Sequence, residues 1–222
     1  MEKKRLNKFL QSRAEINECT ALLRTNNLIE SGLDCKNFDI AHVVPYMKDG
    51  DNIADLGSNG SYILQNAVQL NYSGRKVGID LGAPEYAPIG NIEYFKGDLM
   101  NTPFESNSFD LVTCLSVVEH QVDYSNLAKE CARLLKTNGQ LIVSCDYWEP
   151  KPDTSKMKLY SLDWNILNKA DVLTVVDEMA KVGINLTSDI DWTTSEAVIN
   201  PQYCSPVAGV SYTFGIFHFT KI

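Results

Sequence analysis

The sequence predicts an α/β protein built on a doubly wound, mostly parallel sheet of seven strands, with an antiparallel pair at one edge. Three observations predict this class. Short apolar runs of strand length alternate with segments long enough for crossover helices, two helical patterns come before the first strand, and two apolar runs follow each other near the end with no helical pattern between them. A chain of 222 residues has the size of one such domain.

Residues 1–50 predict a helical cap. Two sets of apolar residues recur at intervals of three or four, which is the spacing of one helix face. They are Ile16, Cys19, Leu22 and Leu23, followed by Ile40, Val43, Val44 and Met47. We therefore expect two helices before the first strand.

Residues 51–148 predict the parallel part of the sheet, which would be the cofactor-binding core. Five apolar runs have strand length: 52–56, 76–79, 92–95, 109–115 and 140–145. The helix between the last two is the clearest. Its apolar face consists of Leu127, Cys131, Leu134 and Leu135. We expect it to end at Asn138-Gly139, because both residue types tolerate left-handed backbone angles.

Residues 149–222 predict the substrate side. Two prolines within 149–155 indicate a long loop. A helix follows, and its apolar residues are Leu173, Val176 and Ala180. We expect that helix to end near Gly183. Strands at 184–190 and 210–220 would then form the antiparallel pair, and the second of them is apolar on both faces, as in a buried strand.

Composition excludes several classes of partner. The net charge of −8 disfavours nucleic acid, because backbone phosphates are normally met by clustered Lys and Arg. The six cysteines are scattered without a C-x-x-C pair or a His at ligand spacing, so we expect reduced thiols and no metal site. No segment has the apolar length of a membrane span or the pattern of a secretory signal, so we expect a cytoplasmic protein that does not bind membranes.

The turn after the first sheet strand carries small residues that let a ligand approach the backbone. It reads Asp55-Leu56-Gly57-Ser58-Asn59-Gly60-Ser61 and leads into a helix near Tyr62. Ligands of open parallel sheets bind beyond the carboxyl ends of the strands, where a helix N-terminus offers N–H groups to an anion. A tight turn without a ligand is the alternative for this segment taken alone.

Two carboxylates follow the next two strands. Asp80, with Leu81 after it, ends an apolar strand at a place where a carboxylate can accept hydrogen bonds from both hydroxyls of a ribose. Asp98, with Leu99, comes just past the third strand, where an acceptor could meet an adenine amino group. An ordinary turn Asp fits Asp98 equally well.

The fourth strand runs into Leu115-Ser116 and then into Glu119-His120 at the same edge. His120 is the acid/base candidate, because the pKa of an unperturbed imidazole lies near neutrality. A loop histidine bonded to backbone is the alternative. His42 and His218 lie away from this edge, and we expect both to be structural.

Candidate substrate-binding residues end the fifth strand: Asp146, Tyr147 and Trp148. Tyr160 and Trp164 lie in the loop that follows. Aromatic rings with polar tips suit a polar organic molecule or a sugar, although each ring could equally fill core space.

The order of these segments resembles the class I S-adenosylmethionine-dependent methyltransferases, particularly those that act on small molecules. The resemblance covers residues 52–148. It includes 127–139, which is similar to the family pattern L-x-E-x-x-R-x-L-K-x-x-G, and it extends to the Tyr-Thr-Phe-Gly stretch at 212–215, where the family has an antiparallel strand. It implies a Rossmann-like methyltransferase fold, with S-adenosylmethionine as the cofactor.

The resemblance also implies roles for single residues. The 55–61 loop would lie against the methionine part of the cofactor, Asp80 and Leu81 against the ribose, and Asp98 and Leu99 against the adenine, while Leu115 and Ser116 would close the pocket. In the loop, the residues implied are Asp55, Gly57, Ser58, Asn59, Gly60 and Ser61. The family loop reads D-x-G-x-G-x-G, and this sequence departs from it at Asn59 and Ser61.

The implied activity is methyl transfer to a small organic acceptor, such as a sugar or another hydroxyl compound, without a metal. His120 would remove the acceptor proton, oriented by Glu119 or another carboxylate. Two alternatives stay open. One is a nicotinamide-dependent oxidoreductase, although the turn is not G-x-G-x-x-G. The other is a non-catalytic, methyltransferase-like binding or regulatory subunit, which the departures at Asn59 and Ser61 motivate.

Overall fold

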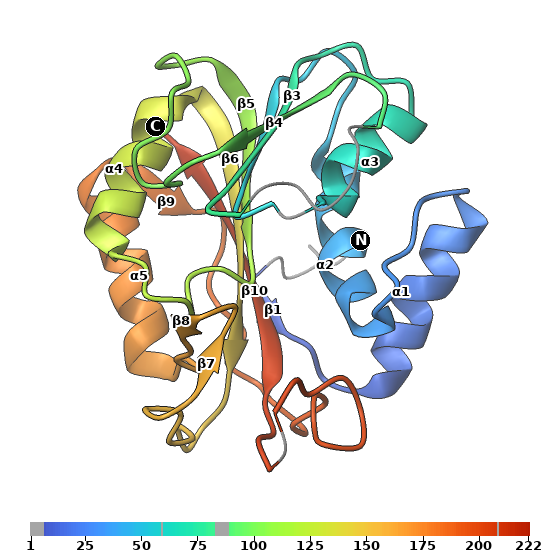
Figure 1. The fold of residues 1–222 in the computed structure, drawn as a ribbon, viewed down its shortest axis with the longest axis vertical. Helices are drawn as coiled ribbons and strands as arrows, with labels where there is room; N and C mark the ends of the chain where they lie inside the picture. The colour runs from blue at the N-terminus through green and yellow to red at the C-terminus, as the bar shows by residue number, and fades with distance from the viewer. Residues whose placement is uncertain (1–6, 59, 83–88, 208) are drawn as a thin grey trace.

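The computed structural model describes residues 7–58, 60–82, 89–207 and 209–222, and these form three layers. A central sheet is covered on one face by α4 and α5 and on the other by α1, α2 and α3 (Figure 1). The α/β class and the mostly parallel sheet predicted from the sequence are confirmed.

The sheet has eight strands in the order β1-β10-β6-β5-β2-β3-β4, with β9 also paired to β10. The bounds are β1 (Lys8–Phe9), β2 (Ile53–Leu56), β3 (Lys76–Asp80), β4 (Ile92–Lys96), β5 (Phe109–Leu115), β6 (Leu135–Tyr147), β9 (Ile184–Leu186) and β10 (Thr213–Lys221). Strands β2 to β6 are parallel, whereas β10 runs antiparallel to β6, β9 and β1. The predicted edge pair is therefore present, and the strand beyond the predicted seven is the two-residue β1, which is too short to give a sequence pattern.

This strand order determines at which edge of the sheet a ligand can bind. From the central β2 the chain proceeds to β3 and β4 on one side, and it then crosses back to β5 and β6 on the other. The connections after β2 and β5 therefore leave in opposite directions, which opens a crevice at the carboxyl ends of these two strands.

Seven helical segments accompany the sheet among the described residues. They are α1 (Arg13–Thr25), η1 (Asp34–Lys36), α2 (Asn37–Val43), η2 (Val44–Tyr46), α3 (Tyr62–Gln69), α4 (Tyr124–Leu134) and α5 (Lys169–Lys181). Side chains cap the longer ones: Ser12 accepts from the Glu15 amide, and Asn168 forms a reciprocal capping box with Asp171. A small hairpin of β7 (Lys158–Leu159) and β8 (Leu162–Asp163) lies outside the main sheet.

The predicted end of α4 was wrong. The helix ends at Leu134, and Leu135 already pairs with Phe109 as the first residue of β6. Asn138 does have a left-handed φ of 62°, but it lies inside a register shift between the β5 and β6 pairs. The turn residue therefore produces an irregularity within a strand and does not end the helix.

The predicted apolar face of α5 was displaced by one residue. The buried side chains are Val172, Val175 and Met179, whereas Leu173 is 41% exposed. The helix has a nearly continuous apolar run, formed by Val172, Leu173, Val175 and Val176. The sequence therefore allows either of two neighbouring apolar stripes along the helix to be the buried one. Packing against the sheet selects the stripe that contains Met179.

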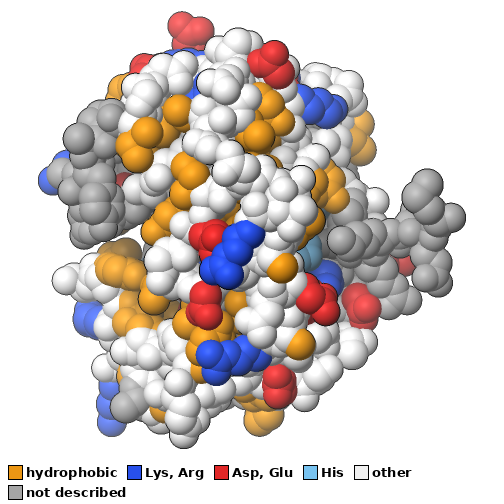
Figure 2. Space-filling model, turned by 90° about the vertical axis from the view of Figure 1, so that its right-hand side faces the viewer, with side chains coloured by type: hydrophobic (Ala, Val, Ile, Leu, Met, Phe, Trp, Pro, Cys, Tyr) orange, Lys and Arg blue, Asp and Glu red, His pale blue; other side chains and the backbone are white. Residues whose placement is uncertain are grey.

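Charges of both signs are mixed on the face formed by α1 and α3. Figure 2 shows Lys and Arg side chains among Asp, Glu and apolar ones, without a continuous basic area on this face. Within the described residues, no helix combines the length and the hydropathy that crossing a membrane requires.

Candidate functional site

The turn after β2 is shaped by one glycine that no other residue can replace without strain. Gly57 has a φ of +81°, and a Cβ there would lie 2.4 Å from Val117 Cγ2. Its amide donates to the Ile79 carbonyl at 2.8 Å, which holds the turn against the end of β3. Asn59 lies outside the described residues.

The departure from glycine at Ser61 has a local reason. The Ser61 hydroxyl accepts from the Leu64 amide at 3.0 Å and thus caps the N-terminus of α3. Gly60, with a φ of +81°, accepts at its carbonyl from the Gln65 side chain at 2.9 Å. The loop therefore keeps a well-formed helix start without the third glycine.

Asp55 is buried beneath this loop. Its Oδ1 accepts from the Thr113 hydroxyl at 2.5 Å, and burial raises its pKa to about 6. Ser58 is buried over β3, where a Cβ at Gly78 would lie 2.2 Å from its hydroxyl. The Ser58 hydroxyl has no hydrogen-bond partner among the described residues.

The next two strands bring Asp80 and Asp98 to the same edge. The Asp80 carboxylate accepts from the Gly82 amide at 2.8 Å, and the Asp98 carboxylate accepts from the Met100 amide at 2.8 Å. Each carboxylate is thus held by the turn that follows it, and a carboxylate has further lone pairs that a ligand can use. Leu99 is buried, whereas Leu81 is 54% exposed beside Asp80.

Leu115 and Ser116 lie half-buried where β5 ends. Ser116 has a left-handed φ of 53°, and its amide donates to the Ser144 carbonyl at 3.1 Å. Its hydroxyl accepts a hydrogen bond from Lys36, which comes from η1. This contact joins the N-terminal helical segment to the edge of the sheet.

Around Lys36 the structure assembles a group that the sequence analysis did not find. We call Lys36, Asp39, Glu119 and Asp146 the acidic cluster. Lys36 Nζ lies 3.8 Å from Asp39 Oδ2 and 4.1 Å from the centre of the Phe214 ring. The three carboxyl groups are 1% to 5% exposed, although they come from α2, the loop after β5, and β6.

Burial dominates the electrostatics of the acidic cluster. It raises the pKa of Asp146 to about 6, raises the pKa of Asp39, and raises the pKa of Glu119 well above its ordinary value. Burial would by itself lower the pKa of Lys36, but the neighbouring carboxylates outweigh it and raise that pKa. Lys36 therefore stays charged.

The acidic cluster is hydrogen-bonded partly within itself. The side chains of Glu119 and Asp146 bond to each other, whereas Asp39 Oδ1 accepts no hydrogen bond among the described residues. Asp146 Oδ2 accepts from the indole N–H of Trp164 at 2.8 Å. No sequence signal marked Lys36 and Asp39, because a Lys and an Asp three residues apart on a helix usually form an ordinary surface pair.

His120 lies half-buried beside the acidic cluster. Burial, reinforced by the charge of Lys36, lowers its pKa to about 4, so the imidazole is neutral at pH 7. Its Nδ1 has no partner among the described residues, and its ring lies 5.9 Å from that of the exposed Tyr160. The other two histidines have structural contacts: the half-buried His42 bonds to the Phe38 carbonyl, and the buried His218 lies against Tyr46 with the two rings tilted by 51°.

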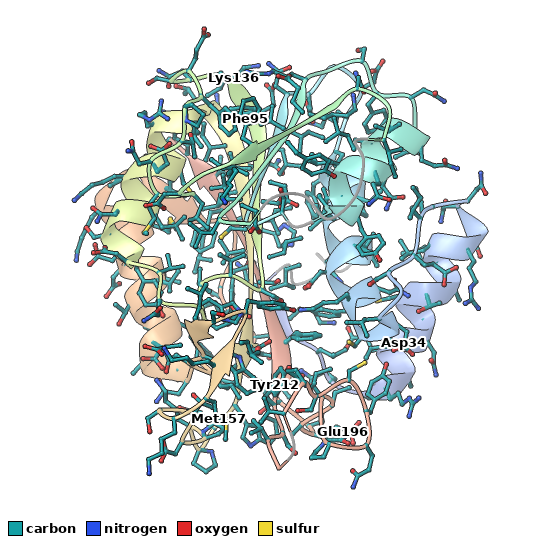
Figure 3. The ribbon with its side chains drawn as sticks, in the orientation of Figure 1. Asp34, Phe95, Lys136, Met157, Glu196 and Tyr212 are labelled. Carbon is teal, nitrogen blue, oxygen red and sulfur yellow. The ribbon has the colours of Figure 1, made fainter. Side chains whose placement is uncertain are left out.

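The three residues predicted to bind substrate at the end of β6 have different environments. Asp146 belongs to the acidic cluster, but the Tyr147 ring packs on Phe9 at 4.1 Å between centroids and is a core contact. Trp148 is half-buried. In Figure 3, Tyr212 and Met157 lie near the end of the sheet where β6 finishes, opposite Lys136 at its start.

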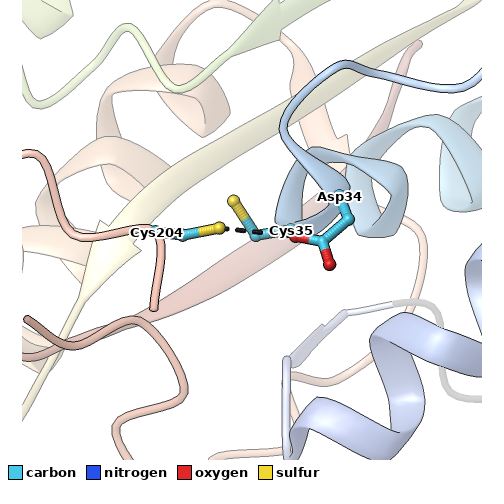
Figure 4. A group of neighbouring side chains, drawn as sticks. All are labelled: Asp34, Cys35 and Cys204. Atoms are coloured by element: carbon cyan, nitrogen blue, oxygen red, sulfur yellow. Dashed lines mark hydrogen bonds between the residues drawn. The ribbon is translucent and has the colours of Figure 1, made fainter. Parts of the chain in front are cut away.

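A second group ties η1 to the loop before β10. Asp34, Cys35 and Cys204 bring their polar atoms within 4.8 Å of one another, and Cys204 Sγ lies 3.5 Å from Asp34 Oδ1 (Figure 4). The Tyr203 hydroxyl donates to the same oxygen at 2.8 Å. One carboxylate and two thiols are groups that can bind a thiophilic metal ion. The contacts among them hold η1, and with it Lys36, against the C-terminal part of the chain.

Comparison with known proteins agrees with this geometry. Residues 54–143 match the model of a methyltransferase domain family. A demethylmenaquinone methyltransferase of Staphylococcus epidermidis is 38% identical over 64 residues, which are 29% of this chain and 27% of that protein. A ubiquinone biosynthesis O-methyltransferase of Sodalis glossinidius is 26% identical over 113 residues, 46% of this chain and 44% of that one. The chain thus spans less than half the length of these relatives.

Solved structures resemble most of the architecture. A geranyl diphosphate C-methyltransferase from Streptomyces coelicolor, solved with Mg²⁺, geranyl diphosphate and S-adenosyl-L-homocysteine, has a TM-score of 0.57 at 15% identity, with 79% of this chain and 73% of that chain covered. An S-adenosylmethionine-dependent methyltransferase from Mesorhizobium loti has a TM-score of 0.57 at 12% identity, with 84% and 98% covered. The fold is the one that these proteins share.

Proposed function

We propose that this chain, which has the class I methyltransferase fold, is an S-adenosylmethionine-dependent methyltransferase that acts on a small organic acceptor. One observation carries the proposal: Asp55, Asp80 and Asp98 lie at or just beyond the carboxyl ends of three adjacent strands, next to the Gly57 turn and the start of α3. A nucleoside carrying an amino-acid group needs acceptors at these three places.

The described residues fit such a donor. The turn with Gly57 and the capped start of α3 would hold the methionine part, together with Asp55. Asp80 keeps lone pairs for two ribose hydroxyls, and the exposed Leu81 beside it offers an apolar surface. Asp98 and Leu99 would hold the adenine, while Leu115 and Ser116 would close the pocket from β5.

When bound, the donor supplies a methyl group on a positively charged sulfur. The main task of the protein is then to align the acceptor with that methyl and to exclude water. Ser116 and Lys36 suit this task, because their hydrogen bond joins the N-terminal helical segment to the sheet edge. Residues 1–50 would in this way act as the cap predicted from the sequence.

We further propose a hydroxyl acceptor, such as a sugar, bound between His120, Asp146 and Trp148. A hydroxyl group would supply a donor to Asp39 Oδ1, which has none among the described residues. The proposed reaction needs no metal, and turnover should persist in the presence of a chelator.

Calorimetric titration with S-adenosylhomocysteine tests the donor site. We expect wild-type protein to bind it with micromolar affinity, and we expect Asp80→Ala to lose at least tenfold in affinity. Asp163→Ala, at the exposed residue of β8, should bind as the wild type does. NAD should give no heat, because the turn is not built for a pyrophosphate. Absence of binding to the wild type would favour a non-catalytic member of the fold.

A further inference from the structure

We propose that Asp34, Cys35 and Cys204 bind one Zn²⁺ ion, which fixes the N-terminal helical segment to the loop before β10. The ion takes no part in methyl transfer, so this inference is independent of the proposed function. The sequence contains no C-x-x-C pair, and for that reason we expected no metal site from it. The fold instead brings Cys204 against Asp34 across a separation of 170 residues.

The three side chains are of the types that bind Zn²⁺. Thiolate sulfur and carboxylate oxygen both occur among its ligands in proteins, and thiolates favour it over hard cations such as Mg²⁺. A carboxylate oxygen of Asp34 and the two Sγ atoms all lie within 4.8 Å of one another (Figure 4). Asp34 and Cys35 are neighbours in η1, so one short helix supplies two of the three ligands. No second group of this kind occurs in the described part of the chain.

The separations suit a tetrahedral ion. With zinc–sulfur bonds of about 2.3 Å and zinc–oxygen bonds of about 2.0 Å, tetrahedral angles place a sulfur about 3.5 Å from an oxygen and about 3.8 Å from a second sulfur. Cys204 Sγ lies 3.5 Å from Asp34 Oδ1. Because no separation exceeds 4.8 Å, the ligands need to move by about 1 Å at most. Water would take the fourth position.

Thiol protons now hold these atoms together. The Cys204 thiol donates to Asp34 Oδ1, and the thiols of Cys35 and Cys204 are hydrogen-bonded to each other. Burial, and then the contact with Cys204, raises the pKa of Cys35. A metal ion binds thiolates and displaces their protons. As one Zn²⁺ enters, two protons therefore leave to water and no electron is transferred.

Neighbouring side chains orient the ligands and balance their charge. The Tyr203 hydroxyl donates to Asp34 Oδ1 at 2.8 Å, and such hydrogen bonds fix the direction of metal-binding carboxylates. Two thiolates and a carboxylate exceed the charge of a divalent ion by one negative charge. The Arg13 guanidinium lies over the Tyr203 ring at 4.0 Å from its centre, and the charge of Lys36 favours the Cys35 thiolate. These two cations offset the excess.

The ligands form a path from solvent to the interior. Asp34 is exposed, Cys204 is half-buried and Cys35 is buried. An ion can thus enter at the carboxylate and be held by a sulfur that is shielded from water. It would fasten η1 to the loop before β10, and η1 carries Lys36, which bonds to Ser116 at the edge of the sheet.

Cobalt absorption and zinc calorimetry on the reduced full chain test the inference. We expect the wild type to bind one Co²⁺, with a thiolate charge-transfer band and the visible bands of a tetrahedral ion, and Zn²⁺ to displace it. Cys204→Ala should weaken Zn²⁺ binding at least about 100-fold, and Asp34→Asn at least about tenfold. Cys131→Ala, on α4 at the other face of the sheet, is the matched control and should bind as the wild type does.

Stability gives a second readout. Zn²⁺ at about 100 times its Kd should raise the urea midpoint of the wild type and of Cys131→Ala, and leave that of Cys204→Ala unchanged, because only the folded chain brings the ligands together. Midpoints measured without metal show whether each variant folds. Asp34→Asn alters an exposed residue, so it keeps the test decisive if Cys204→Ala does not fold.

Three results would overturn the inference. They are Co²⁺ uptake without a thiolate band, Zn²⁺ affinity unchanged in Cys204→Ala or Asp34→Asn, and an equal loss of affinity in Cys131→Ala. A reduced chain that takes up no Co²⁺, but forms a disulfide between Cys35 and Cys204 with hydrogen peroxide, would assign the pair to redox chemistry instead. Binding of S-adenosylhomocysteine bears on none of these results.

Discussion

Two buried glutamates should respond in opposite ways to the same substitution. Glu119→Gln removes a carboxyl group whose bonding partner is the neighbouring carboxyl group of Asp146, whereas Glu130→Gln removes one that accepts from Thr102 at 2.8 and 2.6 Å and from Arg133 at 2.8 and 2.6 Å. The two changes are chemically identical and leave the side-chain volume almost unchanged. They therefore separate a carboxyl group kept for function from one kept for stability.

The magnitudes follow from the contacts. Glu130→Gln loses hydrogen bonds to a charged partner and turns an amide N–H₂ toward Arg133, so we expect a loss of about 2–4 kcal/mol in the free energy of unfolding. Glu119→Gln removes a buried carboxyl group whose pKa burial raises well above its ordinary value, so that its ionised form is disfavoured in the folded state. We expect a gain of about 1–2 kcal/mol at pH 7.5, because the amide avoids that cost.

The sign of the pH dependence gives an independent check. The folded state holds the Glu119 proton more tightly than the unfolded state, so the Glu119 contribution to stability is fully present below the unfolded pKa and is lost as pH rises toward the raised folded pKa. The slope is at most about 1.4 kcal/mol per pH unit. The advantage of Glu119→Gln over wild type should thus be larger at pH 7.5 than at pH 5.

Urea unfolding followed by tryptophan fluorescence at pH 5, 6 and 7.5 measures these differences. Equal destabilisation by both substitutions, at every pH, would refute the reasoning. It would mean that the carboxyl group of Glu119 stabilises the fold as strongly as that of Glu130 does.

Three further predictions concern other parts of the site. Gly57→Ala should lower the free energy of unfolding by about 1–3 kcal/mol, measured by urea unfolding, because its φ is +81° and the new Cβ meets Val117; unchanged stability would contradict this geometry. S-adenosylhomocysteine should bind more weakly as pH falls through about 6, where Asp55 takes up a proton, and calorimetry should find that dependence reduced in Asp55→Asn. A thiol reagent should modify Cys204 before the other five cysteines, which are buried, and Cys204→Ser should abolish the fast phase.

Local patterns predicted the parallel core well. The five parallel strands lie where apolar runs meet turn residues, since a strand buried on both faces leaves a clear mark in the sequence. The wrong predictions concern positions where the sequence allows two local structures and tertiary packing decides between them. Leu135 pairs with Phe109 and thereby ends α4 earlier than Asn138 would, and the α5 stripe is set by contact with the sheet.

The candidate site was predictable only on the donor side. Asp55, Asp80 and Asp98 lie at or just beyond the ends of three strands that follow one another in the sequence. Because the carboxyl ends of parallel strands meet at one edge of a sheet, these residues lie together. The acidic cluster obeys no such rule. Lys36 and Asp39 reach Glu119 and Asp146 only because the N-terminal helical segment packs over the sheet edge, and sequence spacing carries no record of that packing.

The place of β10 has a consequence for how the chain is made. This last strand pairs with β6, β9 and the first strand, β1, and the Asn7 side chain accepts from the His218 amide 211 residues away. Residues 7–10 are synthesised before β10, with which they pair. Pairing over such a separation is slow, so these residues must wait unpaired until β10 has been made. The acidic cluster, which depends on the same N-terminal segment, would then be among the last features to form.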